Sequence, residues 1–230
     1  MKSVFITGTD TEVGKTVVTG LLARYFLDKG ESVITQKWVQ SGSPKFSIDI
    51  ANHLKIIGKK KSCIKNELSD VCPYVFKLPA SPHLASLRES KTININKIKK
   101  SFRALKKKFD WVIVEGIGGA LVPLSSKKLV IDIVKELKLP TIVIVGNRLG
   151  AINHTLLTIE ALRSRGLKII GLIFNDLSEA TNRIVLEDNP KIVEYISKET
   201  ILGILPYSKN KELLYKKFIP IAKKISNLLK

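Results

Sequence analysis

Three residues near the start of the chain, Gly14, Lys15 and Thr16, have the types and order that end a phosphate-binding loop. They follow an apolar run at residues 4–7 and precede a stretch with helical periodicity. Backbone N–H groups at such a helix start bind phosphate oxygens. A lysine there neutralises the β- and γ-phosphates, and a threonine hydroxyl binds Mg²⁺. These residues therefore predict a site for a magnesium-bound nucleoside triphosphate.

The same loop contains two carboxylates, Asp10 and Glu12, and it is one residue longer than the common form, with five residues between Gly8 and Gly14. Carboxylates repel an incoming phosphate unless they point elsewhere. Two interpretations remain open. Either the acidic side chains point away and only backbone amides face the phosphate, or they face a cationic co-substrate beside the γ-phosphate.

Other polar residues end apolar runs further along the chain. Lys37 closes residues 32–37, and Glu115 closes residues 111–115. A carboxylate at such a position suits Mg²⁺, which prefers hard oxygen ligands. Asn175, at the end of residues 169–175, has an amide that can pair with the edge of adenine, although the pair with Asp176 is also typical of a turn.

These residues need a scaffold that brings strand ends together. Short β-rich runs alternate with amphipathic stretches, and several of the runs are apolar on both faces. This pattern predicts an α/β fold: one doubly wound, mostly parallel sheet with helices on both faces, like a P-loop NTPase, in a single domain over residues 1–230. The expected strands are residues 4–7, 32–37, 111–115, 141–145, 169–175 and 200–205; the expected helices are residues 16–29, 48–57, 94–108, 130–137, 152–165 and 211–229. Residues 57–90 are the least regular, and we expect long loops or a lid there.

Composition limits the possible partners. The net charge is +19, but 32 of the 39 basic residues are lysines scattered along the chain. Nucleic-acid recognition favours arginine, so we read the charge as solvated surface and expect no nucleic-acid partner, with a basic stripe for DNA as the alternative. No apolar run approaches the ~20 residues of a membrane span. Cys63 and Cys72 are expected to be reduced thiols, and the protein is expected to be cytoplasmic.

Several motifs in order resemble the dethiobiotin synthetase family. They begin with TGTDTEVGKT at residues 7–16 and QKWVQSGS at residues 36–43. CPYVF, SPH and VEGIGG follow, and then LGAINHTLLT at residues 149–158 and FND at residues 174–176. Together they cover nearly the whole chain. The resemblance implies an ATP- and Mg²⁺-dependent ligase of biotin biosynthesis. Such an enzyme joins 7,8-diaminononanoate and CO₂ through a carbamate and a carbamic-phosphoric anhydride, and it releases ADP and phosphate.

The resemblance also implies roles for residues. Lys37 and Lys15 would be catalytic, with Lys37 stabilising the carbamate and the transferring phosphoryl group. Thr16, Asp49 and Glu115 would hold Mg²⁺. Because the co-substrate of the family is a diamine, the resemblance favours the interpretation in which the loop acids face a cationic co-substrate. Glu12 would then favour binding of an amine-bearing ligand. The substrate residues would be Ser41, Gly118, Gly150 and Asn153, with the substrate at a homodimer interface. The nucleotide residues would be Thr11, Glu12, Val13, Gly14, Lys15, Thr16, Val17, Glu115, Gly116, Gly118, Asn175, Asp176, Pro206 and Tyr207.

Histidines and two departures from the family motifs complete the expectations. His83 and His154 are interpreted as structural hydrogen-bonding residues, and His53 as a residue on a helix surface. Trp38 replaces a proline and Ile117 replaces a small residue of the family motifs. Both bear on the fit of the substrate rather than on the type of reaction.

Two other functions remain as alternatives. Partition and septum-positioning ATPases share the predicted fold and act as dimeric switches, but their loop begins with a signature lysine where this chain has Asp10. An inactive regulatory homologue of the synthetase would explain Trp38 and Ile117. The presence of Lys15, Lys37 and Glu115 argues against it.

Overall fold

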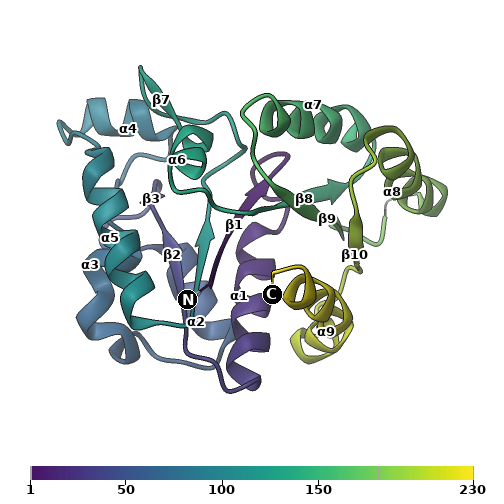
Figure 1. Ribbon diagram of the computed structural model, residues 1–230, viewed down its shortest axis with the longest axis horizontal. Helices are drawn as coiled ribbons and strands as arrows, with labels where there is room; N and C mark the ends of the chain where they lie inside the picture. The colour runs from purple at the N-terminus through teal and green to yellow at the C-terminus, as the bar shows by residue number, and fades with distance from the viewer. Residues whose placement is uncertain (1, 181, 230) are drawn as a thin grey trace.

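Residues 2–180 and 182–229 are described by a computed structural model, in which six parallel strands form the central sheet (Figure 1). The strand order is β10-β9-β8-β1-β5-β2. Every neighbouring pair in this order is parallel. The strands are β1 (Lys2–Gly8), β2 (Val33–Lys37), β5 (Trp111–Glu115), β8 (Thr141–Asn147), β9 (Ile169–Asp176) and β10 (Ile201–Leu205). The predicted doubly wound α/β fold is confirmed.

Helices cover both faces of this sheet because its strands are apolar on both sides. On one face, side chains of β1, β5 and β8 pack against α1 (Lys15–Asp28) and α9 (Lys211–Leu228). On the other face they pack with the remaining long helices. These are α2 (Ile48–Ile56), α5 (Ile95–Lys108), α6 (Val130–Glu136), α7 (Ala151–Arg163) and α8 (Arg183–Ser197). Figure 1 shows α9 beside α1, and α7 and α8 at the β8–β10 end of the sheet.

The expected element boundaries agree with the structure to within about two residues. Asn94 caps α5 and accepts a hydrogen bond from the N–H of Asn96 at 2.9 Å. Two expectations were wrong. Helix α8 was not predicted, because Pro190 interrupts its sequence pattern. Residues 57–90 are more regular than expected and contain η1 (Lys61–Glu67), α3 (Leu68–Val71), β4 (Tyr74–Val75) and α4 (Pro82–Arg88).

Two small sheets, the two cysteines and the hydropathy of the helices complete the description of the fold. β4 pairs with β3 (Val39–Gln40), and β6 (Pro123–Ser125) pairs with β7 (Lys128–Leu129). Cys63 and Cys72 are free thiols, Cys63 exposed and Cys72 buried. Among the described residues, no helix has the length and hydropathy needed to cross a bilayer.

Trp38 is a core residue. Its ring stacks on Phe5 with 5.3 Å between the ring centroids, and its indole N–H donates to Gln36 Oε1 at 3.0 Å. The side chain is 3% exposed. Trp38 therefore fills space beneath the sheet edge, and its bulk does not project into the loops at the strand ends.

Candidate functional site

The phosphate loop joins β1 to α1 at the carboxyl edge of the sheet. Two of its residues, Glu12 with φ 58° and Gly14 with φ 98°, have left-handed backbone conformations that turn the chain into the helix. Gly14 precedes α1, and a Cβ there would overlap the side-chain amide of Asn175. A glycine is therefore required at this position on two counts, its positive φ and the close approach of Asn175.

Lys15 is folded over this loop and is buried. Its Nζ donates to the backbone oxygen of Asp10 at 2.5 Å. Burial and the nearby Lys37 ammonium lower the pKa of Lys15 to about 8. Burial therefore disfavours the charged form of Lys15 in the free protein. A bound phosphate would stabilise that charge, so the position of Lys15 suits phosphate binding.

We expect this lysine to make nucleotide binding depend on pH. Phosphate oxygens raise the pKa of Lys15, so above pH 8 the free protein must take up a proton when it binds ATP. The affinity should fall by up to about tenfold per pH unit above that point. Calorimetric titration of the protein with ATP from pH 7 to 9.5, in buffers of different ionisation enthalpy, measures both the affinity and the proton uptake. The variant Lys15→Met should bind weakly at every pH and lack this proton uptake.

A buried ion cluster lies beside the loop, where β2 and β5 end. These strands pair in a register that places Lys37 directly opposite Glu115. Lys37 Nζ lies 2.8 Å from Glu115 Oε1, 2.6 Å from Asp49 Oδ2 and 2.8 Å from the carbonyl oxygen of Gly116. The structure therefore brings together Lys37, for which a catalytic role is predicted, and Asp49 and Glu115, for which a metal-binding role is predicted, from three different elements.

The charges in this cluster stabilise one another. Burial disfavours the charged form of Lys37, but the carboxylates of Glu115 and Asp49 outweigh it and raise the pKa of Lys37. Burial likewise opposes ionisation of Glu115, but the Lys37 ammonium and a hydrogen bond with His53 outweigh it and lower the pKa of Glu115. Lys37 is thus a permanent cation and Glu115 a permanent anion near neutral pH.

The same oxygens fit a magnesium ion. Thr16 Oγ1 donates to Glu115 Oε1 at 3.0 Å, and Asp49 reaches the same cluster through Lys37. These donors are a hydroxyl and two carboxylates, the hard ligands that Mg²⁺ prefers. The described residues contain no group of three His, Cys, Asp or Glu side chains that could hold a metal alone.

The two loop acids differ in their surroundings. Asp10 accepts a hydrogen bond from the N–H of Thr11 at 2.7 Å and pairs with Arg148 Nη2 at 3.2 Å. Its carboxylate therefore faces a cation of the protein itself, next to the start of α7. Glu12 is exposed to solvent at the rim of the loop. The amine-directing role expected for Glu12 stays a prediction.

The expected base-binding residues lie at the ends of β9 and β10. Asn175 Nδ2 donates to the carbonyl oxygen of Val13 at 3.0 Å, so this side chain lies against the phosphate loop. Asp176 Oδ1 accepts from Asn147 Nδ2 at 2.8 Å, and its partial burial raises its pKa. Pro206 and Tyr207 follow β10 directly, on the strand next to β9. All four therefore share the edge where the loop lies.

Ser41, a predicted substrate residue, begins a short loop of residues 41–43, here named the substrate loop, which is held on both sides. Gln40 Nε2 donates to the carbonyl oxygen of Ser41 at 2.9 Å, and Gln40 Oε1 accepts from Ser47 Oγ at 2.8 Å. On the other side, the N–H of Gly42 donates to Leu78 and the N–H of Ser43 donates to Phe76. Gln40 was not expected at the site, because a glutamine in a short strand gives no chemical signal of its own.

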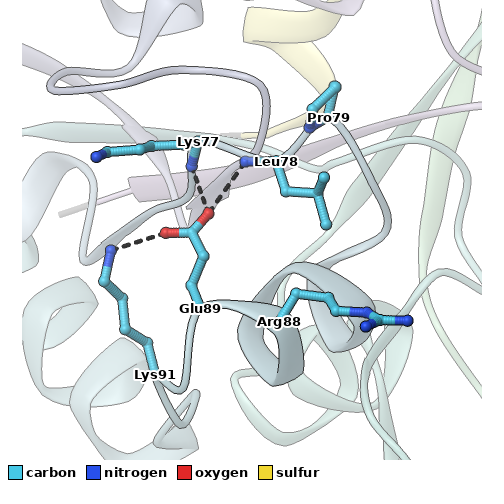
Figure 2. Close-up of a pocket in the computed structure, with 6 residues that line it drawn as sticks. All are labelled: Lys77, Leu78, Pro79, Arg88, Glu89 and Lys91. Atoms are coloured by element: carbon cyan, nitrogen blue, oxygen red, sulfur yellow. Dashed lines mark hydrogen bonds and ion pairs between the residues drawn. The ribbon is translucent and has the colours of Figure 1, made fainter.

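The segment that supports this loop is anchored by Glu89. As Figure 2 shows, the Glu89 carboxylate accepts hydrogen bonds from the N–H groups of Lys77 and Leu78, at 2.6 and 3.0 Å, and pairs with Lys91 at 2.9 Å. An open cavity of about 730 Å³ lies beside this anchor. None of the sequence-predicted site residues lines that cavity, so it is separate from the phosphate site. Its lining residues are Lys77, Leu78, Pro79, Arg88, Glu89 and Lys91.

A second cavity connects the phosphate loop with α7. It has a volume of about 210 Å³, and its lining includes Thr9, Gly119, His154 and Leu157. Gly150, with φ 85°, precedes α7 and starts the helix near this cavity. Asn153, on the first turn of α7, is exposed, as is Leu149.

The glycines after β5 lie close to the loop. A Cβ at Gly118, where φ is 59°, would overlap Val122 and come within 3.8 Å of Thr11. Ile117 packs partly buried against the core. Val17, in the first turn of α1, also packs on the core beneath the loop. The side chain of Val17 thus contributes to the packing of the core, while its backbone belongs to the first turn of α1.

His53 was assigned wrongly to a helix surface. It is fully buried, and its Nε2 lies 2.6 Å from Glu115 Oε2. The missed signal is its spacing from Asp49, since residues four apart lie on the same face of a helix. His83 is exposed and bonds Ser81 Oγ through Nδ1 at 3.0 Å, which agrees with a structural role.

Comparison with known proteins agrees with this geometry. A family model described as an AAA domain matches residues 2–212. An ATP-dependent dethiobiotin synthetase (BioD 2) of Haemophilus influenzae is 40% identical over 189 residues, covering 82% of this chain and 98% of that protein. The dethiobiotin synthetase of Chlorobaculum tepidum is 44% identical, covering 78% of this chain and 74% of that protein.

Solved structures show the fold. The cell division ATPase MinD of Pyrococcus furiosus superposes with a TM-score of 0.61 at 17% identity, covering 99% of this chain and all of that chain. At such low identity the likeness to MinD concerns the fold alone. The identity to the synthetases, 40% and 44%, extends over most of the chain. The chain therefore belongs to the family of ATP-dependent dethiobiotin synthetases.

Proposed function

We propose that this protein is an ATP-dependent cyclo-ligase that forms dethiobiotin from 7,8-diaminononanoate, CO₂ and ATP, with release of ADP and phosphate. One observation carries the proposal. In a chain this similar to the synthetases, the buried cluster of Lys37, Asp49 and Glu115 lies beside the phosphate loop and bonds to Thr16. A phosphoryl acceptor and a triphosphate can meet at this edge of the sheet.

The residues have distinct tasks in this proposal. Loop amides and Lys15 bind the triphosphate, while Thr16, Asp49 and Glu115 hold Mg²⁺, which would neutralise charge on the phosphates. One substrate amine adds CO₂ to form a carbamate, and a carbamate oxygen attacks the γ-phosphorus as ADP leaves. The second amine then attacks the carbonyl carbon, expels phosphate and closes the ureido ring. Lys37 stabilises the negative charge of the carbamate and of the phosphoryl group in transit.

Phosphate release in the presence of diaminononanoate, bicarbonate and Mg-ATP tests the proposal directly. We expect release to require the diamine and to match the dethiobiotin formed. Diamine-independent hydrolysis that DNA stimulates would instead favour a switch of the partition or septum type. Nucleotide binding without any diamine-dependent turnover would favour an inactive homologue.

The substrate is proposed to lie at the interface of a homodimer. Leu121 and Leu157, which are 51% and 56% exposed, line the α7 cavity next to the phosphate loop, and Leu149, which is 84% exposed, lies just before α7. A second copy would cover them, and Gly150 and Asn153 at the start of α7 would meet the substrate carboxylate. Glu12, Ser41 and Gly118 would face the diamine. We place the reaction in the cytoplasm, where ATP is available.

The variant Leu157→Arg should break this dimer, because it puts a charge at an exposed apolar position that lines the α7 cavity. We expect a monomer by light scattering after size-exclusion chromatography, and a raised KM for the diamine. Leu213→Arg, at a leucine that is 48% exposed on α9, serves as the matched control. A Leu157→Arg protein with unchanged mass would contradict the proposed interface.

A further inference from the structure

Glu115 is held from two sides, and only one of them belongs to the proposed magnesium and phosphoryl machinery. Its Oε1 bonds Thr16 at 3.0 Å and Lys37 at 2.8 Å. Its Oε2 bonds His53 Nε2 at 2.6 Å. Side-chain exposure is 0% for His53 and 1% for Glu115, so the contact is shielded from solvent. The two carboxylate oxygens of Glu115 therefore bond to different residues: Oε1 to Thr16 and Lys37, and Oε2 to His53.

The hydrogen bond of His53 with Glu115 defines the role of one ring nitrogen. Nε2 must carry a proton, because a carboxylate oxygen is an acceptor. Nδ1 is buried without a hydrogen-bond partner within residues 2–180 and 182–229. The geometry thus fits an imidazole ring that donates from Nε2 to Glu115 Oε2.

Helix α2 brings His53 to this place together with Asp49. The two residues are four apart, on one face of the helix, and both point into the cluster around Glu115. α2 packs against α1, where a Cβ at Gly20 would overlap Ile56. The missing side chain at Gly20 lets α2 come close to the helix whose first residues are Lys15 and Thr16. The position of the ring is therefore set by the packing of two helices.

We propose that His53 is a positioning residue of the magnesium site: by holding Glu115 Oε2 it keeps the carboxylate rotated so that Oε1 faces Thr16 and the metal. This inference rests on the proposed function and adds a residue to it. The ordering of a ligating carboxylate by a hydrogen-bonded partner typically changes metal affinity by about 10–100-fold. His53 itself touches neither nucleotide nor metal in this proposal.

Two substitutions that introduce the same amide group on side chains of different length test the inference. In His53→Gln the amide nitrogen can occupy the place of Nε2 and donate to Glu115, whereas the shorter side chain in His53→Asn ends near the place of Nδ1. The readout is the Mg²⁺ concentration that half-maximally promotes binding of a non-hydrolysable ATP analogue, measured by calorimetry. We expect it to rise about 10-fold or more in His53→Asn and much less in His53→Gln.

A neighbouring variant separates positioning from stability. Leu54→Ala removes a buried side chain from the same helix without touching Glu115, so it should lower the thermal stability of the metal-free protein and leave the Mg²⁺ dependence unchanged. The inference is overturned if the half-maximal Mg²⁺ concentration of His53→Asn stays within about twofold of the wild-type value. It is also overturned if this concentration rises as much in His53→Gln as in His53→Asn. The proposed function fails separately, if the wild-type protein shows no diamine-dependent phosphate release.

Discussion

Replacement of Lys37 by methionine is expected to lower kcat for dethiobiotin formation by about 10³-fold, with the fold retained. Methionine keeps the length of the side chain but removes the ammonium that bonds Asp49, Glu115 and the Gly116 carbonyl. The loss should fall on kcat, because the charge that Lys37 stabilises is greatest in the transition state. Steady-state measurement of diamine-dependent phosphate release gives the value.

The same substitution has a consequence for stability. Without Lys37, the buried carboxylate of Glu115 and the partly exposed carboxylate of Asp49 lose the cation between them. The two negative charges then repel each other unless one carboxylate takes up a proton. We expect the metal-free variant to melt at a lower temperature and to regain more stability from Mg²⁺ than the wild type does. Lys45→Met, at an exposed lysine close to the substrate loop, is the control. Turnover of Lys37→Met at the wild-type rate would refute the mechanism.

Substitution of Glu115 by glutamine should cost both activity and stability. The variant keeps the shape of the side chain but removes the charge that pairs with Lys37 and accepts from His53 and Thr16. Loss of one partner of a buried ion pair destabilises a protein by about 3–5 kcal/mol. We expect turnover to fall by at least about 10²-fold, because a metal ligand and the counter-ion of Lys37 are lost together. Denaturant unfolding of the metal-free protein and phosphate release measure the two effects.

The stability difference should depend on pH in a defined direction. The pKa of Glu115 is lowered in the folded protein from an ordinary value of 4.5. Below pH 4.5 the unfolded chain takes up a proton at this residue while the folded protein does not, so the contribution of Glu115 shrinks as the pH falls. The wild type and Glu115→Gln should therefore converge in stability on acidification. Glu212→Gln, at a surface ion pair with Arg24, should change stability little at any pH.

Most of the fold was predictable because the pattern along the chain is strong. Strands buried on both faces form continuous apolar runs, and helices with one apolar face separate them, so all six central strands were expected. Helix α8 escaped prediction because Pro190 usually ends a helix, whereas here the helix continues around it. The small elements of residues 57–90 are too short for periodicity to reveal them.

The sequence by itself determined which residues stand at strand ends: the loop with Lys15 and Thr16, and the polar residues Lys37, Glu115 and Asn175. A phosphate loop and strand ends are local features, so their residue types and spacing are sufficient to identify them. The family motifs added the expected roles.

Only the tertiary structure decided which of these residues meet. Lys37 bonds Glu115 because β2 lies next to β5 in the sheet and not next to β1. The order of strands in a sheet cannot be predicted from the local periodicity of the sequence. His53 is buried against Glu115 because α2 packs closely on α1; its spacing from Asp49 places the two on one face of the helix, but only this packing shows that the face is buried. Contacts between distant segments depend on how helices and strands pack together, which is why the site was complete only in the folded chain.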